Sequence, residues 1–150
     1  MYKSIPGFED YMINEQGEVI SLKNNKIKIL KQHVELGYFR VNLHKDNKQI
    51  KMHIHRLLGI TFLNCPHDKQ IDHIDGNRRN NNLENLRVVT NQENCFNRTK
   101  AKGYYWHKNS CKWMAYISLN HKMKHLGYFN TEEDARQAYL DAKKIYHVIK

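Results

Sequence analysis

The sequence has few cysteines, and their placement suits no cross-linked framework. Cys65, Cys95 and Cys111 are odd in number and widely spaced, and none belongs to a CxxC pair of the kind that binds zinc. These features exclude a disulfide scaffold and a cysteine-based zinc site. We expect three reduced thiols, as in a cytoplasmic protein.

Long apolar runs are also missing. No stretch approaches the roughly 20 apolar residues that span a bilayer, and the N-terminal MYKSIPGFEDY lacks the charged-then-apolar layout of a secretion signal. Internal repeats and low-complexity tracts are absent. The sequence therefore predicts a soluble, cytoplasmic protein with no membrane partner.

Positive charge, by contrast, is in excess. The formal net charge is +10 over 150 residues, distributed as +4 over residues 1–66, +1 over 67–100 and +5 over 101–150. Basic flanks favour a polyanion such as double-stranded DNA, because phosphate contacts release counterions. Charge alone leaves a merely soluble basic surface as the alternative.

The pattern predicts an α+β chain of three segments, of which residues 1–66 form a small β-rich module. Strands over 38–44 and 49–53 should form a hairpin, and alternation along the first of them places Arg40 and Asn42 on its polar face. We take both as candidates for DNA contact. Shorter strands precede this hairpin at 11–13 and 18–20, and a short helix follows at 55–63.

Residues 101–150 predict three strands followed by one helix. Thr131 is a fair N-cap with acidic residues after it, and Lys143 and Lys144 complement the macrodipole near the helix end. The apolar face of that helix is predicted to comprise Ala135, Ala138, Tyr139, Ala142 and Ile145.

The central residues 67–100 predict a strand, a polar loop, a second strand and a short helix. Asp72 and His73 end the first strand, Asn85 precedes the second, and Asn94 falls in the helix. Such an Asp-His pair alone would more often be a polar turn with a satisfied histidine. The spaced asparagines in strand–loop–strand–helix order favour a functional site instead.

These residue types suit phosphodiester hydrolysis. An unperturbed histidine has a pKa of about 6.5, so His73 can act as a neutral base, and Asn85 could fix its ring by accepting a hydrogen bond from the N–H of the other ring nitrogen. Asp72 and Asn94 offer oxygen ligands for a hard cation such as Mg²⁺ or Mn²⁺. Neighbours on a strand point to opposite faces, so Asp72 and His73 share a site only where the strand ends or twists.

Residues 69–98 resemble the HNH, or ββα-metal, nuclease motif of phage and intron-encoded homing endonucleases. The resemblance implies His73 as general base, Asn85 as its orienting residue, and Asp72 and Asn94 as ligands of one metal ion per site. The last position is often histidine in that family. Asn94 stands there instead, which favours Mg²⁺ or Mn²⁺. Arg78 and Arg79, in the loop of the motif, are further candidates for DNA contact.

Segments on either side of this motif carry weaker resemblances. Residues 5–11 with 17–22 are similar to a small module that precedes HNH cores and helps to grip DNA; a purely structural β-unit is the alternative. His53 and His55 form an HxH pattern, but no further ligand lies in the local sequence, so we expect packing or helix-starting roles.

The C-terminal segments 103–106, 112–117 and 125–135 resemble an APETALA2-type DNA-binding domain, which lays a three-stranded sheet in the major groove. Alternation predicts that Trp113, Ala115 and Ile117 face the helix, while Met114, Tyr116 and Ser118 face outward. The characteristic arginines of that family are missing from these strands. Candidates for base or backbone contact are Tyr105, His107, Tyr116, Ser118 and His125, and those for phosphate are Lys108, Lys112, Lys122 and Lys124.

The sequence therefore predicts a site-specific DNA endonuclease. A single Asp72-His73 set per chain predicts nicking of one strand by a monomer that needs no protein partner. A catalytically inactive, sequence-specific DNA-binding regulator is the alternative.

Overall fold

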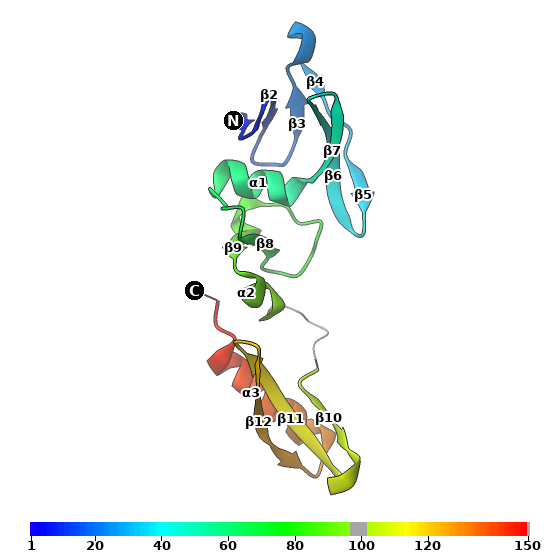
Figure 1. Cartoon of the computed structure of the whole chain (residues 1–150), viewed down its shortest axis with the longest axis vertical. Coiled ribbons are helices and arrows are strands. Elements are labelled where there is room, and N and C mark those ends of the chain that lie inside the picture. The colour runs from blue at the N-terminus through cyan, green and yellow to red at the C-terminus, as the bar shows by residue number, and fades with distance from the viewer. Residues whose placement is uncertain (97–101, 150) are drawn as a thin grey trace. The chain divides into compact units, whose positions relative to one another are not determined.

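A computed structural model describes residues 1–96 and 102–149. The chain forms two compact units, Met1–Asn91 and Gln92–Lys150 (Figure 1). Each unit combines strands with helix, which confirms the predicted α+β class. The units divide at residue 91, whereas the sequence suggested boundaries after 66 and 100. The assignment of a separate function to each of the three predicted segments stays a prediction.

The first unit contains two antiparallel sheets and a two-stranded hairpin. The hairpin predicted over 38–53 is confirmed, with Asp46 and Asn47 at φ of 51° and 58° in the two-residue turn that suits strand twist. The elements are β1 (Lys3–Ile5), β2 (Phe8–Ile13), β3 (Val19–Ser21) and β4 (Lys28–Ile29) in one sheet, β5 (His33–Glu35), β6 (Tyr38–Lys45) and β7 (Lys48–His53) in the other, and β8 (Gln70–His73) with β9 (Leu86–Val89) in the hairpin.

Helix α1 (Ile54–Phe62) packs against both sheets and against the β8–β9 hairpin (Figure 1). Its buried Leu57 and Leu58 belong to one apolar core that also includes Ile71 of β8. Gly59 makes the close approach possible, since a Cβ there would lie 2.4 Å from Ile71 Cδ1. The hairpin that carries Asp72 and His73 is thus fixed by the same core as the β-rich module.

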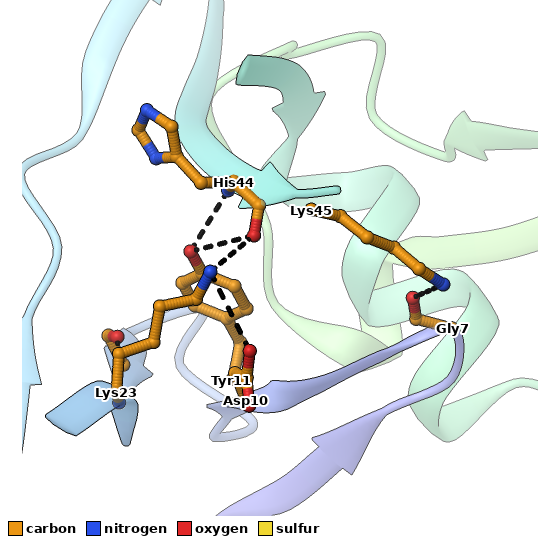
Figure 2. A network of polar contacts seen from close by, with 7 residues as sticks. Gly7, Asp10, Tyr11, Lys23, His44 and Lys45 are labelled. Atoms are coloured by element: carbon orange, nitrogen blue, oxygen red, sulfur yellow. Dashed lines mark hydrogen bonds and ion pairs between the residues drawn. The ribbon is translucent and has the colours of Figure 1, made fainter. Parts of the chain in front are cut away.

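Polar contacts join the two sheets at the far end of β6. The Tyr11 hydroxyl of β2 accepts a hydrogen bond from His44 N at 2.9 Å, and Lys23 donates to the carbonyl of the same residue at 2.6 Å (Figure 2). Nearby, Lys45 donates to Gly7 O at 2.8 Å. These two lysines therefore bind the protein's own backbone, and Asp10 lies 3.6 Å from the Lys23 ammonium.

The second unit has the predicted three strands and helix. They are β10 (Tyr104–His107), β11 (Lys112–Leu119), β12 (Lys122–Phe129) and α3 (Glu132–Tyr146), and the short α2 (Asn91–Phe96) begins at the last residue of the first unit. The side chain of Thr131 caps α3 by accepting from Asp134 N, as predicted. None of the described helices is both long and apolar enough to cross a membrane.

The apolar face of α3 was predicted correctly except at its end. Ala135, Tyr139 and Ala142 are buried, and Tyr146 packs against the same cluster. Ile145 is 68% exposed, so its predicted place on this face is wrong. At 100° per residue, position 146 returns to the azimuth of Ala135, whereas position 145 is turned about 80° away from it.

Candidate active site and nucleic-acid interface

The β8–β9 hairpin sets the register of the candidate active site. Asp72 lies directly opposite Arg87, and His73 lies opposite Leu86. His73 is the last residue of β8, and its carbonyl accepts from Gly76 N at 2.9 Å in the turn that follows. The strand therefore ends at His73, as the predicted sharing of one site by Asp72 and His73 requires.

Asp72 and Arg87 form a buried ion pair across the hairpin. Arg87 Nε and Nη2 both donate to Asp72 Oδ2, at 2.9 Å and 2.7 Å. The carboxylate side chain is 8% exposed and the guanidinium side chain 28%. A carboxylate at such depth requires a partner, because burying an isolated charge is costly.

The loop between the strands is ordered by its own asparagines. Asp75 accepts from Asn80 Nδ2 at 2.8 Å, from Asn77 N at 2.8 Å and from Asn85 Nδ2 at 3.0 Å. These bonds, that from Asn80 foremost, lower the pKa of the exposed Asp75. The loop thus keeps a negative charge on Asp75, stabilised mainly by hydrogen bonds from asparagines of the same loop.

The side chain of Asn85 forms hydrogen bonds to residues of the same loop. Its amide nitrogen also donates to Asn80 O at 2.9 Å, and its oxygen accepts from Asp75 N at 3.1 Å. Its backbone carbonyl accepts from Ile74 N at 2.9 Å, immediately after His73. The predicted side-chain bond from Asn85 to His73 is not among these contacts, and its role as the orienting residue stays a prediction.

His73 itself is 5% exposed and lies among polar and aromatic groups. Its Nε2 is 3.0 Å from Asn81 Oδ1. Because an amide oxygen only accepts, this contact places the proton on Nε2 and the basic lone pair of the neutral ring on Nδ1. The rings of His55 and Tyr38 lie 5.0 Å and 6.0 Å from the His73 ring.

The proposed metal ligands, Asp72 and Asn94, belong to different compact units. Among the residues that the structure describes, no group of three or more His, Cys, Asp or Glu side chains could hold a metal ion. The donors on offer are one carboxylate and one amide oxygen, which fit a hard divalent cation that takes its other ligands from water and phosphate.

The four predicted DNA contacts of the first unit differ in availability. Arg40 is 15% exposed, lies 3.0 Å from a Glu35 carboxylate oxygen and donates to Asn42 Oδ1 at 2.6 Å. Arg78 donates to the Leu36 carbonyl at 3.2 Å and lies over the Tyr38 ring at 4.9 Å. Arg79 is exposed, and its backbone NH donates to Asn77. Arg78 and Arg79 are therefore better placed than Arg40 and Asn42 to meet a phosphate.

The outward face of the β10–β12 sheet carries a connected set of rings. Consecutive centroids lie between 4.9 Å and 6.3 Å apart. We call this set the ring array; it comprises Tyr105, His107, Tyr116, His125 and Tyr128. Four of its members were predicted as contact candidates. Tyr128, which is 45% exposed, was missed because the bulge between Ala115 and Tyr116 shifts the register of β12.

The burial pattern agrees with the predicted two faces of β11 from Ala115 to Ser118, whereas Trp113, predicted to face the helix, is only partly buried. Ala115 and Ile117 are buried, Ser118 is exposed, and Tyr116 contacts Tyr105 in the ring array. Met114 is on the outward side yet only 8% exposed, because the Tyr105 hydroxyl covers it with a 3.5 Å contact to sulfur.

The predicted phosphate-binding lysines do not share one face. Lys112 pairs with His107, which places it with the ring array. Lys124 pairs with the buried Ile117 and lies over the Tyr146 ring of α3 at 4.3 Å, on the helix side of the sheet. Lys122 alternates with Lys124 on that side, and Lys108 lies in the turn between β10 and β11.

Four residues around Asp72 and His73 were not among the predicted site residues: Tyr38, His55, for which a packing or helix-starting role was expected, Asn81 and Arg87. Arg87 lies opposite Asp72 in the β8–β9 register, and opposite charges on two predicted neighbouring strands could have suggested this ion pair. The approach of Tyr38 and His55 to His73 joins residues distant in sequence, so no local pattern could indicate it.

Comparison with known proteins points to one family. A family model described as HNH endonuclease matches residues 53–95, and one described as the NUMOD4 motif matches residues 2–44. H-N-H endonuclease F-TflII of Escherichia phage T5 is 34% identical over 114 residues, which cover 73% of this chain and 58% of that protein. DNA endonuclease I-HmuI of Bacillus phage SP01 is 39% identical over 101 residues, or 64% of this chain and 56% of that protein.

A solved structure of the HNH homing endonuclease I-HmuI, concerned with DNA binding and cleavage, matches the fold. The TM-score is 0.57 at 32% identity, and the match covers 83% of this chain and 76% of that chain. The chain spans a little more than half the length of the two curated phage relatives. With the buried Asp72 and His73 at the end of the β8–β9 hairpin, these matches show that the chain belongs to the HNH endonuclease family.

Proposed function

We propose that this protein is a site-specific DNA endonuclease that hydrolyses a phosphodiester bond with His73 as general base. The observation that carries the proposal is the buried His73 ring at the end of β8, bonded to Asn81 and next to the buried Asp72, in a chain of the HNH endonuclease family. The I-HmuI structure concerns DNA binding and cleavage, which supports the same substrate here.

In this proposal the protein's own groups handle the proton. Asn81 holds the Nε2 proton of His73, so the Nδ1 lone pair takes the proton from the attacking water. Asn85 keeps the loop in shape through its bonds to Asp75 and Asn80, and so acts on the base through the backbone. Arg87 neutralises Asp72 in the resting protein and offers a cation near the negatively charged phosphate.

Asp72 and Asn94 would hold one Mg²⁺ or Mn²⁺ ion. When bound, such an ion neutralises charge on the phosphate and stabilises the departing oxygen. The fit rests on donor chemistry, because carboxylate and amide oxygens suit hard cations better than metals that select nitrogen or sulfur ligands.

We further propose that the second unit reads duplex DNA as an APETALA2-like sheet. The support is the ring array on the outward face, the exposed Ser118 and Lys112 beside it, and the net charge of +5 over residues 101–150. Tyrosine and histidine provide hydrogen bonds and flat apolar surface for base edges and sugars. In the first unit, Arg78 and Arg79 are the proposed phosphate contacts, with Arg40 and Asn42 as weaker candidates.

The single catalytic set per chain supports nicking of one strand by a monomer. Supercoiled plasmid incubated with the full chain and Mg²⁺ should turn to open circles, and linear DNA should appear only later through a second nick. Direct conversion of supercoiled plasmid to linear DNA at single-turnover concentration would count against nicking of one strand by a monomer.

The His73→Ala variant tests the enzyme itself. General-base loss should lower the cleavage rate by roughly 10²–10⁴-fold, while plasmid binding in a gel-shift assay stays unchanged. His67→Ala, at an exposed position outside the site, is the matched control and should cut like wild type. Equal activity of His73→Ala and wild type, or no cutting by either with Mg²⁺ or Mn²⁺, would favour a DNA-binding regulator.

A further inference from the structure

Rings from outside the β8–β9 hairpin form one wall around His73. His55, in the first turn of α1, approaches the His73 ring edge-on, with centroids 5.0 Å apart and planes at 62°. Tyr38 lies 5.0 Å from His55 and 6.0 Å from His73. His53 stacks on His55, with ring centroids 5.4 Å apart and planes at 23°.

His55 stays uncharged in this position. Burial above all, followed by the neighbouring His73, His53 and Arg56, lowers its pKa to about 3. A charged ring against His73 would oppose the protonation that a general base must undergo, whereas a neutral ring does not. Arg56, although adjacent in sequence, donates to Lys69 O at 2.6 Å and so is engaged elsewhere.

The rings of Tyr38 and His55 are held near His73 by contacts to the loop after β8 and by the packing of α1. Arg78, from the loop after His73, covers the Tyr38 ring at 4.9 Å and binds the Leu36 carbonyl. His55 lies in the first turn of α1, and the same helix packs against β8 through Gly59 and Ile71. The His55 and His73 rings are therefore held by elements that share one core.

We propose that His55 is a positioning residue for the catalytic base: its neutral ring, packed edge-on, holds the imidazole of His73 in the orientation that catalysis needs. The proposal rests on the proposed function of His73. A metal-ligand role for His55 has less support, because the described residues contain no group of three or more side chains suited to a metal. His55 Nδ1 is buried and has no hydrogen-bond partner among the described residues, and the contact of His55 with His73 is between the two rings.

The test compares His55→Ala with His55→Phe in the full chain, using a nicked-product assay with Mg²⁺. Loss of the ring should lower kcat by roughly ten- to a hundredfold, as expected for a misplaced catalytic group, with KM for DNA within twofold. Phenylalanine restores a neutral ring and should return kcat to within about threefold of wild type. If His55→Ala fails to fold in a thermal-unfolding control, His55→Leu replaces it.

Three outcomes would overturn the proposal: full activity of His55→Ala, a rise in KM with kcat unchanged, or no rescue by His55→Phe. The last would assign the effect to an imidazole nitrogen. His67→Ala again serves as the exposed control.

A second measurement keeps this inference separate from the proposed function. If the wild type does not cut DNA, the enzyme proposal fails, but the positioning of His73 can still be read by NMR. The ring C–H signals of His73 should be single and narrow in wild type and in His55→Phe, and broadened or shifted toward free histidine in His55→Ala. Unchanged His73 signals in His55→Ala would refute the positioning role.

Discussion

The end of the β8–β9 hairpin and the outward face of the β10–β12 sheet both contain histidine, tyrosine and basic residues. The two regions differ in how far these side chains are buried. At the hairpin, Asp72 and His73 are 7% and 5% exposed and are held by Arg87 and Asn81. On the sheet, Tyr105 and Tyr128 are 44% and 45% exposed.

This difference in burial indicates that the hairpin suits catalysis and the sheet face suits recognition. Chemistry benefits from groups fixed in advance by burial and hydrogen bonds, whereas recognition benefits from exposed rings that can meet a ligand. Changes at the hairpin should therefore damage stability and rate, and changes on the ring array should damage binding alone.

The largest effect on stability is expected from breaking the buried ion pair. Arg87→Met leaves the Asp72 carboxylate buried without its main partner, which should cost about 3 kcal/mol of unfolding free energy. Urea denaturation of the full chain, followed by circular dichroism, measures the loss, and the fluorescence of Trp106 and Trp113, both in the second unit, should show that unit unfolding as in wild type. Arg79→Met, at an exposed position, is the control and should change stability by less than about 0.5 kcal/mol.

Asn81 and Asn85 offer a sharper test of what orients the base. Asn81→Ala removes the Nε2 contact of the buried His73 and should lower kcat by roughly tenfold or more, about 1.4 kcal/mol, and the unfolding free energy by about 1 kcal/mol. Asn85→Ala removes three loop bonds and should lower stability by about 1–2 kcal/mol as well as rate. A rate loss confined to Asn85→Ala would restore Asn85 as the direct partner of His73.

The two regions should also respond differently to acid. Because the pKa of His55 is about 3 in the fold and near 6.5 when unfolded, the unfolded chain binds the extra proton between these values. Stability is therefore complete above pH 6.5 and is lost as pH falls toward 3, by up to about 2 kcal/mol at pH 5. Denaturation at pH 7.5 and pH 5 should show this loss in wild type and a smaller one in His55→Phe.

The sequence predicted the local parts of this comparison well. Strands over 38–44 and 49–53 were predicted as a hairpin, Thr131 as a helix start, and strand alternation separated Ala115 and Ile117 from Tyr116 and Ser118. These features depend on residues close together in the sequence, so the pattern of a single sequence is enough to predict them.

The parts that were missed depend on distant neighbours. The approach of His55 to His73 requires α1 to pack on β8, and the place of Tyr128 in the ring array requires the bulge in the β11–β12 pairing. Such contacts are decided by tertiary packing.

On the ring array, substitutions should change affinity without changing the chemical step. Tyr128→Ser removes an exposed ring and should weaken duplex binding about three- to tenfold, while kcat at saturating DNA and thermal stability stay near wild type. Fluorescence anisotropy with a cleavable duplex in Ca²⁺ measures the affinity. Ile145→Ser, an exposed apolar position on α3, is the matched control. Equal weakening by both would move the DNA-binding surface away from the sheet.

The smallest effect separates two lysines of the same sheet. Lys112 shares the face of the ring array, whereas Lys124 lies over Tyr146 on the helix side. If the outward face meets the phosphates, Lys112→Ala should weaken binding uniformly across sequences and reduce the slope of log affinity against log salt by about 1. Lys124→Ala should leave that slope unchanged. A reduced slope for Lys124→Ala with no change for Lys112→Ala would reverse the assignment of faces, because only a phosphate contact releases counterions.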